Sequence, residues 1–309
     1  MPLGPNVKAA ALELGFLAAG ICSLEDSPRA DALDRWLERG FAGTMRYLHR
    51  QAPKRKQPSS IVPGATAAVV VLDNYFPGPD PVTPGVKIAK YARGRDYHLA
   101  CTERLDRLAW ALSGMGATIA RPFVDAGPVP ERELAHRAGL GWFGKNTMLI
   151  RPGVGSWFFI GSVFTDLALE PDRPFATDHC GSCSRCLDAC PTQAFPEPGV
   201  LDATRCLSYL TIEYRGEPPV ELAPGYRGWA FGCDICNDVC PWNVRFATPN
   251  DNPDYRDRGE INLTDPDFFE TMTSDEYQRR FADTPLERPG LAGMQRNYRA
   301  AFASLTPPP

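Results

Sequence analysis

Cysteine spacing constrains this chain more than any other feature of its sequence. The segment HCGSCSRCLDACP contains Cys180, Cys183, Cys186 and Cys190, and Pro191 follows the last cysteine directly. Three closely spaced thiolates can wrap one cubane cluster, and the proline then turns the chain so that the fourth cysteine serves another cluster. Zinc sites are usually built from pairs of cysteines. The four-cysteine run therefore predicts iron–sulfur clusters.

A second run, GCDICNDVCPW, lacks one cysteine of the same pattern; it contains Cys233, Cys236 and Cys240. Exchange of the fourth ligand between the runs gives Cys240 to the first cluster and Cys190 to the second. Cys206 is the only cysteine between the runs, and with it the segment has eight cysteines, which two four-thiolate clusters use completely. We therefore predict one [4Fe-4S] cluster on Cys180, Cys183, Cys186 and Cys240, and another on Cys190, Cys206, Cys233 and Cys236.

The rest of the sequence indicates a cytoplasmic protein without a membrane segment. Cys22 and Cys101 lie in apolar patterns typical of packed free thiols. The N-terminus has no basic patch followed by an apolar run, so we expect no signal peptide. No apolar run reaches the about 18 residues of a membrane span. The ten cysteines then favour metal binding or catalysis over disulfides.

Hydrophobic periodicity predicts an α/β or α+β domain over residues 1–168. A cysteine- and proline-rich domain is expected over 169–245, and an acidic, mostly helical segment over 246–309. In the first domain, NTMLI and SWFFIGSVF resemble an antiparallel pair joined by the turn RPGVG. The expected helices are 6–19, 31–38, 96–116 and 130–139, and the other expected strands are 66–75 and 118–125.

Charge is distributed unevenly between the two halves. Residues 1–150 contain 19 Lys and Arg against 14 Asp and Glu, whereas residues 151–309 contain 14 against 23. Basic patches of this kind bind phosphates, although a solvated helix face is the more common explanation. The basic residues are Arg35, Arg39, Arg46, Arg50, Lys54, Arg55 and Lys56, followed by Lys87, Lys90, Arg93 and Arg95.

Two adjacent clusters form an electron relay, so a further site must use the electrons. No G-x-G-x-x-G follows a strand, and a dinucleotide-fold site is therefore unsupported. Asp125 closes a predicted strand before a Gly-Pro turn, where burial would raise the pKa of its carboxyl group and make it a proton donor. From position alone, a turn-capping aspartate is the better interpretation.

Several stretches together resemble the epoxyqueuosine reductase family. They are KYARGRDYH, RPFVDAGPVPERELAHRAGLGWFGKNTMLI, CLSYLTIE, GCDICNDVCPWN and MQRN, and the resemblance extends over essentially the whole chain. The resemblance implies an α+β fold, in which a cobalamin-binding α/β domain is fused to a ferredoxin-like domain with two [4Fe-4S] clusters and a short helical C-terminal segment. It also implies reduction of epoxyqueuosine to queuosine at the wobble position of tRNA.

In this family, two electrons pass through the clusters to base-off cobalamin, and an aspartate donates a proton. The motif VDAG makes Asp125 that aspartate. The resemblance further implies an external electron donor, and we expect a monomer. It assigns corrin contacts to Arg55, Ala89, Asp125, Leu149, Ile160, Ser208, Cys233 and Asp234, and a tRNA contact to Arg215.

Two other functions are compatible with the same motifs. A reductive dehalogenase-like enzyme would use the same cofactors on a small molecule, but the basic patches and the absent export signal count against it. An electron-carrier module without its own chemistry would not bind cobalamin. Salt-dependent binding would favour tRNA over a small substrate.

Overall fold

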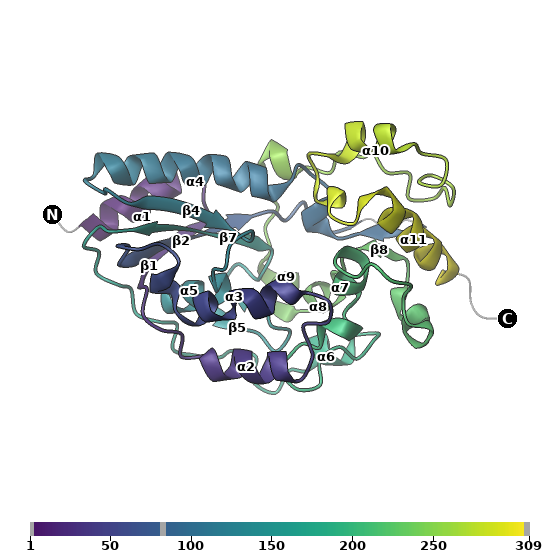
Figure 1. Cartoon of the computed structure of the whole chain (residues 1–309), viewed down its shortest axis with the longest axis horizontal. Helices are drawn as coiled ribbons and strands as arrows, with labels where there is room; N and C mark the ends of the chain where they lie inside the picture. Colours follow the sequence, from purple (N-terminus) through teal and green to yellow (C-terminus); the bar gives the residue numbers. More distant parts are fainter. Residues whose placement is uncertain (1–2, 81–84, 306–309) are drawn as a thin grey trace.

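The computed structural model describes residues 3–80 and 85–305. Its centre is a four-stranded antiparallel sheet with strand order β1-β2-β7-β4. Helices cover both faces of this sheet (Figure 1). The predicted mixture of helices and strands is therefore confirmed. The strands of the sheet are β1 (Ala18–Ser23), β2 (Ala67–Asn74), β4 (Ala120–Val124) and β7 (Phe158–Thr165).

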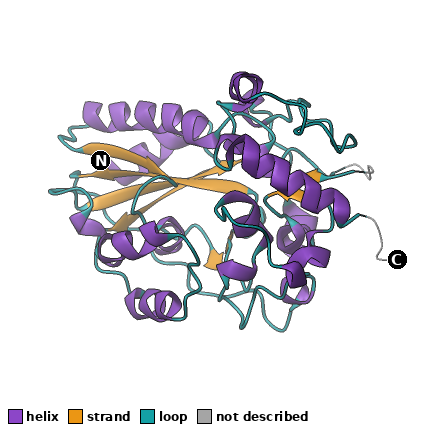
Figure 2. Ribbon diagram, turned by 45° about the vertical axis from the view of Figure 1, so that its right-hand side comes forward, coloured by secondary structure: helices purple, strands orange, loops and turns teal. Residues whose placement is uncertain are grey.

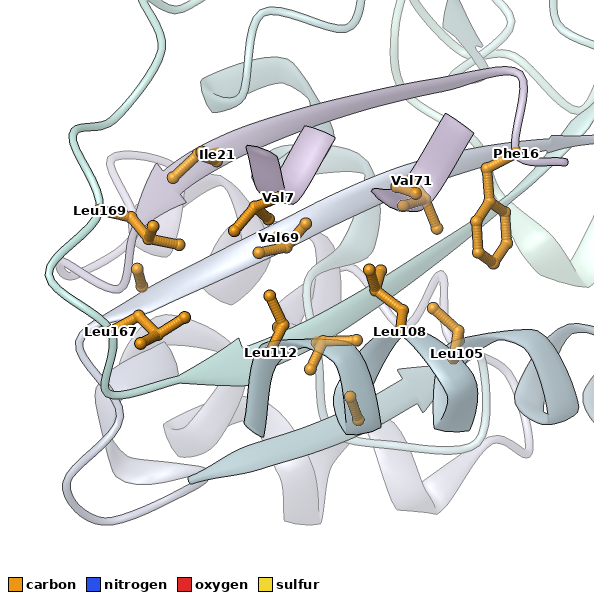
Figure 3. Close-up of a cluster of buried hydrophobic side chains, with 14 of the residues drawn as sticks. Val7, Phe16, Ile21, Val69, Val71, Leu105, Leu108, Leu112, Leu167 and Leu169 are labelled. Atoms are coloured by element: carbon orange, nitrogen blue, oxygen red, sulfur yellow. The ribbon is translucent and has the colours of Figure 1, made fainter. Parts of the chain in front are cut away.

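Strand β2 explains why the sheet carries helices on both sides. Its residues Ala67 to Asp73 are all buried, and successive side chains of a strand point to opposite faces. Val69 and Val71 enter the core beneath α1 (Leu3–Glu13) and α4 (Tyr97–Gly114). Figure 3 shows this cluster. Val70 and Leu72 enter the opposite core, which contains side chains of α5 (Glu131–Arg137).

Two expected elements differ from the structure. The first helix ends at Glu13, and part of the segment expected to be helical forms strand β1 instead. The expected hairpin of NTMLI with SWFFIGSVF is wrong, because β7 pairs with β2 and β4 in the middle of the sheet. The short strand β6 (Leu149–Ile150) pairs instead with β5 (Trp142–Phe143). In both cases long-range strand pairing overrides the local pattern.

The cysteine-rich segment and the C-terminal segment lie beside the sheet domain (Figure 1), and this part of the molecule consists mainly of helices and loops (Figure 2). Strand β3 (Lys87–Ile88), which precedes α4 in the chain, pairs in parallel with β8 (Trp229–Phe231). Helix α11 (Gly290–Ala303) packs against β8. The remaining helices are α2 (Ala30–Glu38), α3 (Arg46–Lys56), α6 (Arg185–Asp188), α7 (Leu207–Ile212), α8 (Ile235–Asp238), α9 (Pro241–Phe246) and α10 (Ser274–Phe281).

Short 3-10 helices connect these elements at Pro58–Ser60, Lys90–Ala92, Ala203–Arg205, Val220–Tyr226, Pro253–Tyr255 and Pro285–Glu287. Within the described ranges, none of the helices combines the length and apolarity needed to span a bilayer. The domain boundaries at 168 and 245 stay predictions.

Candidate functional site

Charge interactions between thiols indicate which of the eight cysteines, seven in the two runs and Cys206 between them, lie near one another; Cys186 and Cys236, of different predicted sets, also interact. In the first set, burial and the neighbouring Cys240 and Cys180 raise the pKa of the Cys186 thiol to about 11. Burial also raises the pKa of Cys240, and Cys180 and Cys183 contribute to this shift. Thiols interact in this way only when they lie close together. Cys180, Cys183, Cys186 and Cys240 are therefore neighbours.

The second set assembles in the same way around α7 and α8. Burial raises the pKa of Cys233, and the nearby Cys206 and Cys190 add to the effect. The pKa of Cys236 is also raised well above its usual value by burial, with Cys233 and Cys206 contributing. The displaced Cys206 thus lies with the cysteines that the exchange rule assigned to it. Ligation itself stays a prediction.

Within residues 3–80 and 85–305, no three His, Cys, Asp or Glu side chains form a group that could hold one metal ion. A tetrahedral zinc site needs four ligands within bonding distance of one atom. A cubane cluster is wider, and its four thiolates stand further apart.

Buried amides fix the cysteine loops against the sheet domain. Asn243 Oδ1 accepts a 2.6 Å hydrogen bond from the Ser156 backbone, and its Nδ2 donates to the Asn237 carbonyl at 2.9 Å. Gly155, with φ of +95°, lets Asn243 approach, since a Cβ there would lie 2.2 Å from Oδ1. Lys145 Nζ donates to the Cys183 carbonyl at 2.9 Å. Such contacts hold ligand loops in place.

Asp125 occupies the end of β4 in a left-handed conformation, with φ of +51°. Its side chain is 58% exposed. The Tyr97 hydroxyl donates to Asp125 Oδ2, and His98 Nε2 lies 3.4 Å from the same oxygen. Tyr97 and His98 begin α4, where Asp96 caps the helix by accepting from the His98 backbone. The expected strand-end position of Asp125 is thus observed.

The electrostatics of Asp125 differ from the expectation. Desolvation by the surrounding protein would raise the pKa of this carboxyl group even though its side chain is largely exposed, but hydrogen bonds from His98 and Tyr97 outweigh it and lower the pKa below its usual value. The expected rise is therefore wrong, because the carboxylate accepts bonds that favour its charged form. Burial alone would lower the pKa of His98, yet bonds and charges of Asp125 and Asp96 raise it to about 9.

Two side chains hold the loop that carries Asp125. Arg55, from α3, donates to the carbonyls of Val129 at 2.9 Å and Gly127 at 3.2 Å. Its Nε is buried without a hydrogen-bond partner among the described residues. Glu131 accepts a hydrogen bond from the Asp125 backbone N–H. Burial and the charge of Asp125 raise the pKa of Glu131 to about 8.

The residues predicted to contact a corrin form two groups. Leu149 and Ile160 pack in the core cluster that also contains Val129, beneath the loop of Asp125. Ala89 lies in another cluster, against Cys206 and Cys233. The backbone N–H and C=O of Ala89 already bond within the protein. Ser208 follows Cys206 in α7, and Asp234 follows Cys233.

The ring of Tyr91 lies between Tyr97, which contacts Asp125, and the apolar cluster beside Cys206 and Cys233. It meets the Tyr97 ring edge-on at 5.9 Å between centroids, and it lies 6.1 Å from the Phe231 ring. Burial raises the pKa of Tyr91, and the charges of both Asp125 and Asp234 add to this shift. Tyr91 thus packs on the cluster that Cys206 and Cys233 border, and it also meets Tyr97, which donates to the carboxylate at the end of β4.

A buried cation lies beside the second set of cysteines. Lys90 Nζ is 2.8 Å from Asp80, 2.9 Å from Asp238 and 3.7 Å from Asp234, and its side chain is only 2% exposed. Burial would lower the pKa of Lys90, but these carboxylates raise it. Burial raises the pKa of Asp234 to about 6 despite Lys90. The ammonium group of Lys90 thus lies among three carboxylates.

Arg215, the predicted tRNA contact, lies next to another arginine. Its Nη2 donates to the Arg288 carbonyl at 2.6 Å, and the Arg288 guanidinium pairs with Glu213 at 3.0 Å. The hydrogen bond to Glu213 raises the pKa of Arg288, although burial lowers it, and the charges of Tyr47 and Asp125 add to the rise. The contact of Arg215 with tRNA stays a prediction.

Sequence reasoning missed the roles of Tyr97, His98, Glu131 and Lys90. A local signal existed for His98, because Asp96 two residues earlier is a typical helix N-cap whose oxygen also reaches the imidazole at 2.8 Å. Glu131 starts a helix after a proline, a usual place for an acid. Neither pattern predicts that both side chains meet Asp125.

Two family models match this chain. One is described as "Epoxyqueuosine reductase QueG, DUF1730" and matches residues 55–126; the other is described as "4Fe-4S double cluster binding domain" and matches residues 179–243. The second match covers both cysteine runs and Cys206. The first extends from Arg55 to just beyond Asp125.

Curated relatives match over nearly the whole chain. Epoxyqueuosine reductase from Pseudomonas aeruginosa is 40% identical, over 98% of this chain and 85% of the relative. The same enzyme from Cellulophaga algicola is 39% identical, over 94% of this chain and 95% of the relative. That from Synechocystis is 40% identical, over 91% of this chain and 98% of the relative.

Solved structures show the same architecture. An epoxyqueuosine reductase crystallised with an epoxyqueuosine-modified stem loop of tyrosine tRNA has a TM-score of 0.87 and 28% identity, covering 98% of this chain and 81% of that one. The Bacillus subtilis enzyme, solved with its catalytic loop swung out of the active site, has a TM-score of 0.88 and 28% identity, covering 98% and 82%.

Proposed function

This chain belongs to the epoxyqueuosine reductase family, and we propose that it reduces epoxyqueuosine to queuosine at the wobble position of tRNA. In this proposal, electrons from an external donor pass through two [4Fe-4S] clusters to a cobalamin, and Asp125 delivers the proton. One observation carries the proposal: Tyr91 packs on the apolar cluster that Cys206 and Cys233 also border, and its ring meets that of Tyr97, whose hydroxyl donates to Asp125.

The cysteines fit the clusters in number and grouping. Two sets of four thiols account for every cysteine of the two runs and Cys206. Bound clusters would accept and pass single electrons. The backbone N–H of Ala194 donates to Cys190 Sγ at 3.3 Å, and Trp142 Nε1 donates to Cys180 Sγ at 3.5 Å. Such bonds stabilise thiolate charge and tune the potential of a bound cluster.

The surroundings of Asp125 also fit a large polar cofactor. The buried Nε of Arg55 has no hydrogen-bond partner among the described residues, which is a costly state unless a ligand group accepts from it. Bound cobalamin would supply a strongly reducing cobalt centre. We propose that Arg55, Ala89, Asp125, Leu149, Ile160, Ser208, Cys233 and Asp234 surround it.

Asp125 lies at the end of β4, where we propose that it meets the substrate. Its oxygen Oδ2 is held by Tyr97, and its backbone is held by Glu131. Loss of an epoxide oxygen as water requires protons at that oxygen, and a positioned carboxyl group can deliver them. Arg55 keeps the loop of Asp125 against the sheet. The loop therefore presents one carboxyl group at a fixed place.

The test is an anaerobic assay with epoxyqueuosine-containing tRNA and added cobalamin. Loss of a positioned proton donor costs about 10²–10⁴-fold in rate. We expect Asp125→Asn to lose activity in this range while retaining both clusters. Asp166→Asn is the matched control, because Asp166 also follows a strand and binds the backbone of Thr118 and Ile119. An Asp125→Asn variant as fast as the parent would exclude the proposed role.

The exposed cations of helix α3 favour tRNA as the molecule that carries the substrate base. Arg46, Arg50 and Lys54 are exposed, four residues apart, and form no ion pairs with the described residues. Successive members of such a stripe rise about 6 Å along the helix and face the same side. Arg55 of the same helix contacts the loop of Asp125. The stripe is therefore placed to bind phosphates of a tRNA whose base enters the site.

Salt dependence tests this contact. We expect the double variant Arg46→Ala and Arg50→Ala to bind tRNA more weakly, and the slope of log K against log salt to fall by roughly 1–2. The control is the double variant of Arg107 and Arg121 to alanine, which removes two exposed cations elsewhere. Equal slopes for both double variants would show that α3 does not contact tRNA.

A further inference from the structure

The stoichiometry of the proposed reaction requires two protons. Removal of an epoxide oxygen to leave a double bond breaks two C–O bonds, consumes two electrons and two protons, and releases one water. A single carboxyl group carries one proton. Asp125 must therefore receive a proton from a neighbour within each turnover, and its lowered pKa means that it starts the reaction as a carboxylate.

We propose that His98 is the proton source of the site and acts through Asp125. Its imidazolium gives the proton on Nε2 to Asp125 Oδ2, and Asp125 passes a proton to the epoxide oxygen. The N–H bond of His98 breaks as the O–H bond of Asp125 forms, and solvent then reprotonates the imidazole. Two such transfers supply both protons. This inference rests on the proposed function.

The geometry holds the His98 ring in place for this transfer. Nδ1 lies 2.8 Å from Asp96 Oδ1, and Nε2 lies 3.4 Å from Asp125 Oδ2. The ring stacks on Tyr97 with 4.2 Å between centroids. Asp96 is itself fixed, because its backbone N–H bonds to the Asp283 carbonyl at 2.7 Å. The imidazole thus bridges two carboxylates in a fixed orientation.

Charge and exposure suit the same role. The groups that face His98 are the carboxylates of Asp96 and Asp125 and the hydroxyl-bearing ring of Tyr97; Glu131 and Arg55 stand behind Asp125. The raised pKa, about 9, keeps the imidazole protonated at neutral pH. Its side chain is 36% exposed, so solvent can return the proton.

The other neighbours of Asp125 are poorer sources. Tyr97 donates to the same oxygen, but burial and the charge of Asp125 raise the pKa of its phenol well above the usual value. Glu131 holds a proton at neutral pH, since its pKa is raised to about 8. However, its contact with Asp125 is to the backbone N–H, where Glu131 accepts. Only His98 combines an available proton with a contact to the carboxylate.

The pH profile of turnover tests the proposal. In the parent enzyme, the rate should fall as pH rises through about 9, where His98 loses its proton. We expect His98→Gln to slow turnover at least 10-fold and to abolish this break, and added imidazole to restore part of the rate. His136→Gln, the control, should keep both rate and profile. A His98→Gln enzyme with the parental rate and break would overturn the proposal.

A second variant and a second readout guard against misfolding. Asp96→Asn keeps an N-cap residue but removes one charge beside the imidazole, so the break should move to lower pH. Proton NMR of the cluster-loaded protein gives the pKa of His98 without turnover. We expect a value above 8 in the parent and a lower one in Asp125→Asn. An imidazole that titrates near 6.5 in the parent would refute the inference, whether or not epoxyqueuosine is the substrate.

Discussion

Different forces stabilise the sheet domain and the cysteine-rich segment. In β2, every residue from Ala67 to Asp73 is buried, and two apolar cores lie on either side of it. In the first cysteine run, no residue from 180 to 190 is buried. Burial of apolar surface therefore stabilises the sheet, whereas we expect bound clusters to supply much of the stability of the first cysteine run. One chain thus combines a large apolar core with a cysteine run that has no buried residue of its own.

The largest expected effect comes from removing the clusters. Chelation under anaerobic conditions should abolish amide-exchange protection over residues 180–190, none of which is buried, and should reduce it less over 233–240, where Asp234, Asn237 and Cys240 are buried. Strands β2 and β7 should stay protected. Hydrogen exchange read by mass spectrometry distinguishes the two regions, and reconstitution of the clusters is the control. Simultaneous loss of protection in β2 would show that the regions are not independent.

The next largest effect concerns the joint between the regions. Lys90→Met leaves Asp234 and Asp238 without their cation, whereas Asp80 keeps its ion pair with Arg93, and Asp234 is 4% exposed. Breaking a buried pair in this way costs about 3–5 kcal/mol. Urea unfolding of the holoprotein measures this cost. Lys87→Met is the control, because Lys87 is exposed and should change stability by no more than about 0.5 kcal/mol.

A cavity in the sheet domain should cost somewhat less. Leu108 is fully buried between α4 and the sheet, and Leu108→Ala should lower the free energy of unfolding by about 2–5 kcal/mol. Leu99, on the same helix, is 44% exposed. Leu99→Ala should therefore change stability by about 0.5 kcal/mol or less. The visible absorption of the clusters should persist in both variants until the sheet unfolds; its early loss would contradict the division into two regions.

The smallest effect is expected where α7 touches the loop before α3. Tyr209 accepts a hydrogen bond from the Thr44 backbone at 2.8 Å and pairs with its hydroxyl at 2.8 Å. Tyr209→Phe removes both contacts and should cost about 1 kcal/mol. Faster amide exchange around Thr44 would locate the loss. Tyr214→Phe is the matched control, because the Tyr214 hydroxyl forms no hydrogen bond with any described residue, and an equal loss there would refute the assignment.

The cysteine sets could be predicted from the sequence because ligand spacing is local. The C-x2-C-x2-C-x3-C-P pattern dictates which thiols wrap one cluster, and counting alone placed Cys206. The structure groups the same thiols. No knowledge of the rest of the fold was needed for this step.

The position of β7 could not be predicted in the same way. Its apolar run, next to the turn RPGVG, is locally typical of a hairpin. Its actual partners, β2 and β4, are far away in the chain, and strand pairing of this kind depends on the assembled core. The first helix was extended too far for the same reason, since Ala18 and Ile21 become strand residues only by pairing with β2.

The candidate site shows the same limit. Its position at the end of β4 followed from the order of strand and turn, but the direction of the pKa shift of Asp125 did not. That shift depends on His98 and Tyr97, which enter from another helix. Such neighbours can raise or lower the pKa of a carboxyl group at a strand end, and only the folded structure identifies them.

The pairing of β3 with β8 has a consequence for synthesis on the ribosome. Lys87 and Ile88 leave the ribosome early, but Trp229 and Phe231, with which they pair, follow only after the remaining sheet strands and the first cysteine run. Long-range pairing of this kind forms late and slowly. The early strand edge must stay unpaired while the cysteines around it emerge. Iron and sulfide delivered to the nascent chain would therefore reach a protein whose two halves are not yet joined.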